Sequence, residues 1–285
     1  MNKQQKFSYF TMSWHRFKSQ KNAVVALTLL LILFIMAIIG PFFSKYTYYE
    51  THLPLKNRPP SWMFWFGSDE LGRDIFTRVW WGARISLFVG LMAASIDLFV
   101  GVVYGSIAGR KRGRIDECMM RIADIIYSIP YLLVVILLTV VLEPGLYTII
   151  IALSLTGWIP MARVTRAQIL YLQELDYAQA AIALGASNLR LLFRHLLPNA
   201  MGPIITTMTF TIPSAIFAEA FLSFLGLGVQ APIASWGTMA SDGLSALRYY
   251  PWRLFFPAFF ISLTMLCFNI IGDGVRNAFD PRLKR

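Results

Sequence analysis

Charged residues are scarce in this chain. Only 14% of its 285 residues are Asp, Glu, Lys or Arg, whereas soluble globular domains usually carry about 25%. Hydrophobic residues make up 56% of the chain, and they lie in runs that reach about 18 residues, the length that predicts a membrane-crossing helix. The composition therefore excludes an ordinary soluble domain and predicts an all-α integral membrane protein with about six transmembrane helices.

Cysteine and histidine are also rare, which excludes several kinds of site. The two cysteines, Cys118 and Cys267, lie in or beside apolar runs and form no C-x-x-C motif. The three histidines are widely separated, and no H-E-x-x-H, G-x-S-x-G or P-loop lysine pattern occurs. We therefore expect no catalytic site, no metal site and no bound cofactor in this chain, and we expect that it does not hydrolyse ATP itself.

Acidic residues are outnumbered by basic ones, 15 to 26, which gives a formal net charge of +11. In a soluble protein this excess would suggest a nucleic-acid partner. Here most of it lies in the loops between apolar runs, where positive charge sets the topology beside anionic lipid. We therefore expect these residues to face a lipid bilayer and not nucleic acid.

The apolar runs divide the chain into three parts. A basic tail, residues 1–21, precedes residues 22–84, which hold a first span and a long polar loop, and residues 85–285 form the core domain. The first run is too long for the apolar core of a signal peptide, which has about 7–15 residues. We place the other spans at approximately residues 85–109, 118–142, 146–164, 199–228 and 254–272, with a cytoplasmic loop at 165–198.

The placement of lysine and arginine predicts the orientation. With a cytoplasmic N-terminus, the inside segments 1–21, 110–117, 163–198 and 273–285 hold five, four, four and four basic residues. The outside loop 44–84 holds six, but it also holds four acids, and long loops weigh less in this balance. We therefore predict that both termini are cytoplasmic.

One polar stretch before the fifth span carries the most information about function. Its residues predict two short helices joined by a bend. Asp176 and Gln179 form an approximate capping box on the first helix, and Gly185 ends it. Ser187 caps the second helix, and Pro198 ends it, because proline cannot continue the helical hydrogen-bond ladder.

These two helices suit contact with a partner protein. Alanines dominate the first helix, and a helix without bulky side chains allows close approach of another backbone. Arg190 and Arg194 lie four residues apart on the second helix and suit acidic groups on that partner. An amphipathic helix pair lying on lipid is the alternative that the local pattern leaves open.

The stretch resembles the signature E-A-A-x-x-x-G-x9-I-x-L-P of permease subunits of ABC importers. Gln179 replaces the glutamate and His195 replaces the isoleucine, but the layout of helix, glycine, helix and proline is intact. The resemblance implies a surface that couples to an ATPase. Its expected residues, with the two arginines included, are Gln179, Ala180, Ala181, Gly185, Arg190, Arg194, His195, Leu197 and Pro198.

Further motifs resemble one branch of that family, the second permease subunit of dipeptide, oligopeptide and nickel importers. The resemblance covers roughly residues 60–282. The motif G-T-D-x-x-G-R-D of this branch stands here as Gly67-Ser68-Asp69-Glu70-Leu71-Gly72-Arg73-Asp74. The other matching segments are Gly82–Leu87, Phe224–Gly228, Trp236–Gly237 and Gly272–Arg276.

The resemblance implies a type I ABC importer permease fold, with five core helices, an extra N-terminal helix and a cytoplasmic coupling helix. It implies a bacterial inner-membrane heterodimer with a homologous permease, in which this chain forms half of the pore for a peptide substrate. Two cytoplasmic ATPases would carry ATP and Mg²⁺, and an extracytoplasmic binding protein would deliver the substrate. A nickel or metallophore importer of the same branch is the alternative within transport, and a membrane-bound enzyme or an uncoupled channel is the alternative outside it.

Two acids lie inside predicted spans, where charge is costly and usually faces a cavity or a partner. Glu219 is a candidate contact for the cationic amino terminus of a peptide, with pairing to a neighbouring helix as the alternative. Asp97 is a second candidate for the substrate pathway. Phe221 and Phe224 are placed on the same pathway, with packing as the alternative.

The long loop contributes a further set of candidate residues. Asp69, Gly72, Arg73 and Asp74 belong to the branch motif and are candidates for docking the binding protein. A local salt bridge behind a helix start at Ser68 is the alternative role of these charges.

Overall fold

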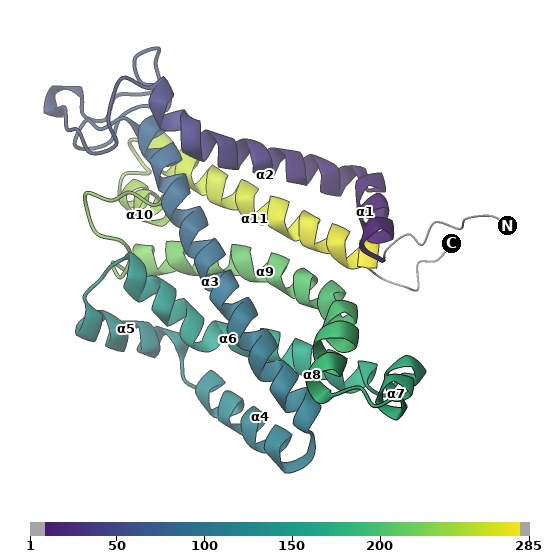
Figure 1. Cartoon of the computed structure of the whole chain (residues 1–285). Coiled ribbons are helices and arrows are strands. Elements are labelled where there is room, and N and C mark those ends of the chain that lie inside the picture. The colour runs from purple at the N-terminus through teal and green to yellow at the C-terminus, as the bar shows by residue number, and fades with distance from the viewer. Residues whose placement is uncertain (1–8, 280–285) are drawn as a thin grey trace.

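The computed structural model describes residues 9–279, which fold mainly into helices (Figure 1). Five helical segments are long and apolar enough to cross a membrane. A sixth is present if α4 (Gly113–Tyr127) and α5 (Tyr131–Leu142), which meet at a bend of 74°, form one span. The basic residues at 1–8 and 280–285, which entered the orientation argument, lie outside the described residues.

The remaining helices follow the apolar runs. In chain order they are α1 (Tyr9–Ser19), α2 (Lys21–Ile39), α3 (Ile75–Lys111), α6 (Leu146–Leu172), α7 (Asp176–Ala183), α8 (Asn188–Leu191), α9 (Leu197–Phe224), α10 (Trp236–Ser245) and α11 (Trp252–Phe279). Two 3-10 turns, η1 (Gly40–Phe43) and η2 (Leu53–Leu55), lie between α2 and α3, and a π-helical turn, η3 (Leu192–Leu196), joins α8 to α9.

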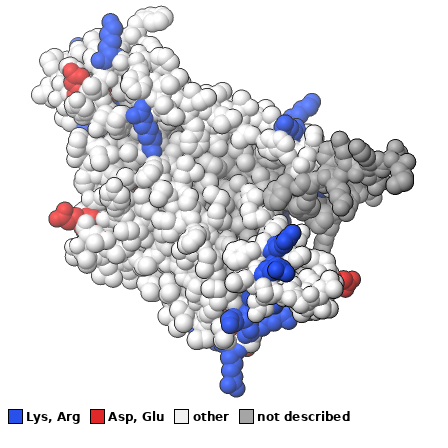
Figure 2. Space-filling model, in the orientation of Figure 1, with Lys and Arg blue, Asp and Glu red and all other residues white. Residues whose placement is uncertain are grey.

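The two ends of the helix bundle differ. Helices α7 and α8 lie at the same end as α1 and the end of α11, whereas α10 and the loop between α2 and α3 lie at the other end (Figure 1). Figure 2 shows a broad belt without charged side chains between these ends, and most Lys and Arg on this face gather near α7 and α8. A surface of this kind fits a bilayer, whose core accepts apolar side chains but not exposed charge.

Helices α3 and α6 pack with their backbones close together. Three glycines, one turn apart on α3, face α6, and a Cβ on each would lie 3.0 Å or less from a carbonyl oxygen of α6. Membrane helices use small residues in this way because van der Waals packing, and not release of water, holds them together. The three residues are Gly101, Gly105 and Gly109.

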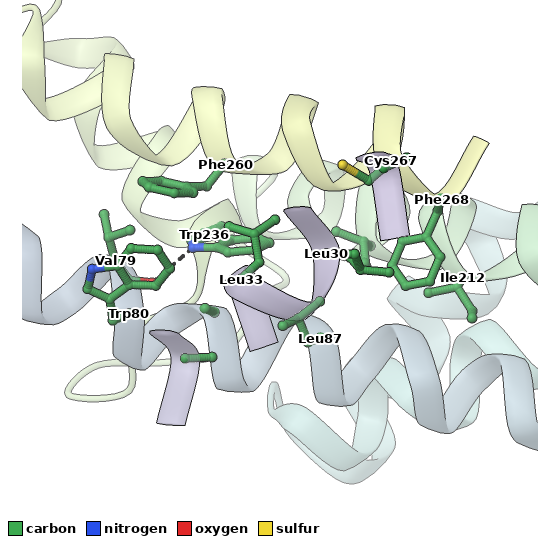
Figure 3. Packing of buried hydrophobic residues seen from close by; sticks show 14 of the residues in the cluster. Leu30, Leu33, Val79, Trp80, Leu87, Ile212, Trp236, Phe260, Cys267 and Phe268 are labelled. Carbon is green, nitrogen blue, oxygen red and sulfur yellow. Dashed lines mark hydrogen bonds between the residues drawn. The ribbon is translucent and has the colours of Figure 1, made fainter. Parts of the chain in front are cut away.

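The largest buried cluster joins α2 to α3, α10 and α11 (Figure 3). Trp236 is fully buried there, and its indole Nε1 donates a hydrogen bond of 2.9 Å to the carbonyl oxygen of Val79. Phe260 of α11 stacks on the Trp236 ring, with centroids 6.2 Å apart. Leu30 and Leu33 of α2 belong to the same cluster. The first span is therefore packed into the bundle and is not a detached anchor.

Helix α3 begins earlier than the sequence predicts. The expected start lay near residue 85, but the helix begins at Ile75. The cause is Asp74, whose carboxylate accepts hydrogen bonds from the backbone N–H groups of Phe76 and Thr77. Such a cap satisfies donors that would otherwise have no partner in the first turn.

The helix predicted at 118–142 is broken in the structure. It ends at Tyr127, and α5 begins at Tyr131 after the 74° bend. Pro130 accounts for the break, because proline disfavours helical geometry in the residue before it and offers no N–H to the ladder. The helices predicted at 146–164 and 254–272 extend further than expected, to Leu172 and Phe279.

Candidate functional site

The predicted coupling segment forms the end of the bundle that carries α7. Helix α7 ends before Gly185, which adopts a left-handed backbone with φ +82°. The N–H groups of Gly185 and Ala186 donate hydrogen bonds to the carbonyl oxygens of Ile182 and Ala181, at 2.9 and 3.0 Å. This glycine-terminated helix end satisfies the last carbonyls of α7, and it confirms the predicted bend at Gly185.

The predicted capping box on α7 is wrong. Leu175 precedes the helix, and no side chain caps its first turn. The side chain of Gln179 instead donates from Nε2 to the carbonyl oxygen of Gln173, 2.7 Å away, which ties α7 to the end of α6. The amide has a donor that a carboxylate lacks, so it can reach a carbonyl rather than an N–H group.

The second half of the segment is longer than predicted. Ser187 caps α8 as expected, with its hydroxyl accepting a hydrogen bond from the N–H of Arg190. The predicted helix end at Pro198 is wrong, since residues 188–224 run on from α8 through η3 into α9. Pro198 lies in the first turn of α9, directly after the π-helical turn. The π-helical turn pairs N–H and C=O groups five residues apart, and this local change in pairing accommodates the N–H that proline lacks.

The tip of the segment exposes large apolar side chains. Leu184, Leu189 and Phe193 are 88%, 68% and 65% exposed, and Arg190 and Arg194 are exposed beside them. Exposed apolar groups next to charge are typical of a protein interaction site.

Buried residues attach the segment to the bundle. Ala178, Leu191 and Leu196 are fully buried in one cluster with residues of α6 and α9. Arg110 at the end of α3 adds polar contacts that the sequence did not reveal. Its guanidinium donates to Gln173 Oε1 at 3.0 Å and to Asn188 Oδ1 at 2.6 Å, so one side chain joins α3, α6 and α8.

Asp69, Arg73 and Asp74 of the long loop make their contacts within the loop and with the first turn of α3, whereas Glu70 pairs with Arg253 of α11 at 3.0 Å. Asp69 accepts hydrogen bonds from the backbone N–H groups of Leu71 and Arg73, both at 2.9 Å, and from the Arg73 guanidinium at 2.6 Å. Asp69, Arg73 and Asp74 are all buried. The helix start lies at Asp74 and not at Ser68, whose hydroxyl accepts from the N–H of Arg58.

Gly72 closes this turn. Its φ is +74°, and a Cβ there would collide with the backbone carbonyl of His52. A side chain is therefore excluded at this position by both backbone conformation and space. The loop motif accordingly builds a fixed scaffold in front of α3.

A cavity of about 380 Å³ opens beside this loop, at the end of the bundle opposite α7. Glu70, Arg73, Arg78 and Asp242 contribute to its lining. Burial raises the pKa of the Asp242 carboxyl, and the nearby positive charge of Arg78 lowers it. The sequence motif pointed to the loop residue Arg73 but not to Asp242, because α10 lies far away from the loop along the chain.

Glu219 is fully buried between three helices. Its carboxylate accepts hydrogen bonds from the hydroxyls of Ser223 at 2.9 Å and Ser86 at 3.0 Å. Ser86 Oγ in turn accepts from the N–H of Trp236 at 3.1 Å. This geometry supports the helix-pairing alternative, because the carboxylate joins α9, α3 and α10 and borders none of the described cavities.

The other pathway candidates have surroundings that differ from those of Glu219. Phe221 and Phe224 near the end of α9 are 40% and 50% exposed. Asp97 lies on α3 and borders a separate cleft of about 470 Å³ between α3, α6, α9 and the α4–α5 break. The structure therefore does not bring the four candidates together into one site.

An apolar bundle of this kind, with five or six segments long and apolar enough to cross a membrane among residues 9–279, is that of a multi-pass membrane protein. The family model "Binding-protein-dependent transport system inner membrane component" matches residues 101–285. The model "N-terminal TM domain of oligopeptide transport permease C" matches residues 8–60. The chain therefore belongs to the family of binding-protein-dependent inner-membrane transport components, and the family and fold predicted from the sequence are confirmed.

Curated relatives resemble the chain over nearly its whole length. The oligopeptide transport system permease protein OppC of Bacillus subtilis (strain 168) is 60% identical over 95% of this chain and 88% of its own. The dipeptide transport system permease protein DppC of the same strain is 57% identical over 99% and 89%. The oligopeptide permease OppC of Escherichia coli (strain K12) is 39% identical over 94% and 89%.

A solved structure shares the fold at low sequence identity. A chain of the structure "Inward facing conformations of the MetNI methionine ABC transporter" aligns with a TM-score of 0.59 and 16% identity. The alignment covers 70% of this chain and 94% of the other. This similarity shows a common fold of the core helices.

Proposed function

We propose that this chain is a transmembrane permease subunit of an ATP-driven, binding-protein-dependent importer of di- or oligopeptides. The names of the relatives support the substrate class. The observation that carries the coupling role is the exposed segment around Gly185, which presents Leu184, Leu189 and Phe193 at one end of the bundle.

The geometry of this segment suits transmission of a mechanical movement. Residues 188–224 form one continuous helical segment that begins at the exposed tip and turns into α9, which runs along the bundle. In this proposal a partner that pushes on the tip displaces the start of α9 directly, and Arg110 links the same tip to α3 and α6. In this proposal ATP and Mg²⁺ act on the partner ATPases, and this chain performs no covalent chemistry.

The partners follow from the same proposal. A homologous permease completes the pore, two cytoplasmic ATPases dock on the coupling segment, and an extracytoplasmic binding protein delivers the peptide. Both termini are then cytoplasmic, because α1 and the end of α11 lie at the same end as α7. The loop 44–74 and α10 face outside, where the docked binding protein meets them.

The nickel alternative has less support. The curated relatives described above are named for oligopeptide or dipeptide transport. Within residues 9–279 no group of three or more His, Cys, Asp or Glu side chains lies close enough to hold a metal ion. The substrate assay therefore begins with peptides.

The test is uptake by the assembled importer. The chain is expressed together with the second permease, the two ATPases and the binding protein of its importer in a bacterium that lacks peptide importers. We expect ATP-dependent accumulation of a labelled tripeptide, competed by unlabelled peptides and not by nickel. Assembly without peptide uptake, or uptake that nickel competes, would refute the peptide assignment. Failure of this chain to co-purify with ATPases would refute the importer assignment.

A further inference from the structure

The cleft beside Asp97 has the composition of a binding site within the bundle. It lies where α3, α6 and α9 meet the break between α4 and α5. Its wall is largely apolar, with several hydroxyl groups, and Asp97 is the one charged residue among the described residues that line it. Binding sites commonly combine an apolar wall with a few placed polar groups.

The Asp97 carboxylate has no partner within the described chain. The residue is 2% exposed, and none of the hydrogen bonds or ion pairs among residues 9–279 involves its side chain. Its Oδ1 atom is buried without a hydrogen-bond donor. A buried carboxylate without a partner is strongly unfavourable, so the group either takes up a proton or meets a donor from outside this chain.

The neighbouring helix leaves room for this carboxylate. Gly157 of α6 lies against it, and a Cβ on Gly157 would be 2.9 Å from Cγ of Asp97 and closer still to Oδ2. Alanine at this position would therefore displace the carboxylate.

The rest of the polar wall offers hydrogen-bond acceptors. The hydroxyls of Thr207, Thr211 and Ser214 each donate to the backbone carbonyl one turn earlier on α9, at 2.9, 3.1 and 2.9 Å. Their oxygen lone pairs remain free to accept. A carboxylate that lines the same cleft as several hydroxyl acceptors suits a compact cation that carries several N–H donors.

We propose that this cleft is a peptide-binding subsite of the translocation pathway and that Asp97 binds the α-ammonium group of the peptide. The proposal rests on the importer function proposed above and adds the residue that receives the substrate. The α-ammonium group carries three N–H donors and is common to peptides whatever their side chains. One carboxylate can therefore serve many sequences, while the apolar wall accepts varied side chains.

Photocrosslinking in the assembled importer tests this placement. Benzoylphenylalanine replaces Thr211 in the cleft wall or, as a control, Val140, which is 79% exposed on α5. The complex is held in nanodiscs with binding protein, ATP and orthovanadate, and a radiolabelled neutral tripeptide is added. We expect crosslinks from position 211 and none above background from position 140.

Substitutions then test the carboxylate itself. Asp97→Asn and Gly157→Ala should each lower the crosslink from position 211 by about tenfold or more, since hydrogen bonds to charged groups are among the stronger ones. Asp97→Glu should retain part of the yield. Gly145→Ala is the matched control, because a Cβ there meets nothing within 4 Å, and its yield should equal that of the wild type.

The peptide supplies the second half of the test. The desamino analogue of the tripeptide lacks the α-ammonium group and is supplied at a concentration that saturates the binding protein equally. Its crosslink in the wild type should be as weak as that of the free peptide in Asp97→Asn. Equal crosslinking of the two peptides would overturn the assignment of the α-ammonium group. Unchanged crosslinking of the free peptide in Asp97→Asn would overturn the role of Asp97.

Three other results distinguish this proposal from the alternative explanations. If Asp97→Asn lowers co-purification of the second permease, the carboxylate pairs with that subunit and the proposal is overturned. If the wild-type importer takes up peptide but position 211 gives no crosslink, the cleft lies off the pathway and only this proposal falls. Absence of peptide uptake by the wild-type importer would instead overturn the proposed function, and this subsite with it.

Discussion

Replacing Gly185 tests the coupling role most directly, because the effect of backbone strain can be separated there from the effect of side-chain bulk. The glycine has φ +82°, and a Cβ on it would meet nothing within 4 Å in this chain. Any residue other than glycine costs about 1–2 kcal/mol in this left-handed conformation. That strain is similar for Ala and Leu, whereas only Leu adds bulk to the exposed tip. A difference between the two variants therefore reports contact with a partner.

We expect both variants to insert in the membrane, since a local strain of about 1–2 kcal/mol is small beside the packing of the bundle. Gly185→Ala should keep most of its association with the ATPases. Gly185→Leu should lose that association, or keep basal ATP hydrolysis while losing uptake. The assays are pull-down of the ATPases and uptake of labelled tripeptide, measured in the same membranes.

Gly226 provides the matched control. Its φ is +78°, and a Cβ there also meets nothing within 4 Å, but it lies at the end of the bundle away from α7. Gly226→Leu therefore carries similar backbone strain without reaching an ATPase, and we expect it to retain the ATPases. Wild-type pull-down and uptake for Gly185→Leu would refute the argument that this segment transmits the ATPase motion. Equal loss in both leucine variants would assign the effect to strain alone.

Three further predictions follow from the fold. Tags at residues 1 and 285 should be accessible only from the cytoplasm, and Leu55→Cys should react with an impermeant thiol reagent from outside. The reverse labelling would contradict the proposed orientation. Glu219→Ala should lower the yield of assembled complex, because the loss of a buried acceptor shared by Ser86 and Ser223 costs about 1–3 kcal/mol; normal yield with lost uptake would instead indicate substrate contact. Arg110→Ala should reduce uptake but leave the ATPase pull-down unchanged, because the coupling segment loses its hydrogen bonds to α3. Hydrogen bonds to charged groups contribute about 1.5–3 kcal/mol. Unchanged uptake would contradict this link.

The sequence was sufficient for the features that depend on local chemistry. Apolar runs gave the all-helical class, because a bilayer accepts only backbones whose hydrogen bonds are satisfied internally. Gly185 was identified as the bend because few residues other than glycine adopt its conformation. Ser187 was identified as a cap because its hydroxyl can reach an N–H group two or three residues ahead.

Local rules failed where two of them compete. Pro198 predicted a helix end, yet a π turn directly before it lets the chain continue as one helical segment. The apolar run around Pro130 predicted one straight span, because hydropathy reports the composition of a segment and not its direction. Both errors concern the path of the backbone, and both places matter for the proposed function: one begins the helix that carries the coupling movement, and the other borders the cleft beside Asp97.

Glu219 and Asp97 show what a single sequence leaves undetermined. Both are acids within apolar runs, so the sequence says of each only that it requires a partner. The partner of Glu219 on α3, Ser86, lies 133 residues away along the chain, and no local pattern connects the two. Packing brings them together and leaves Asp97 facing an open cleft with no donor from the described chain. A carboxylate therefore holds helices together at one position and, as we propose, receives the substrate at the other, and the difference arises only when distant helices meet.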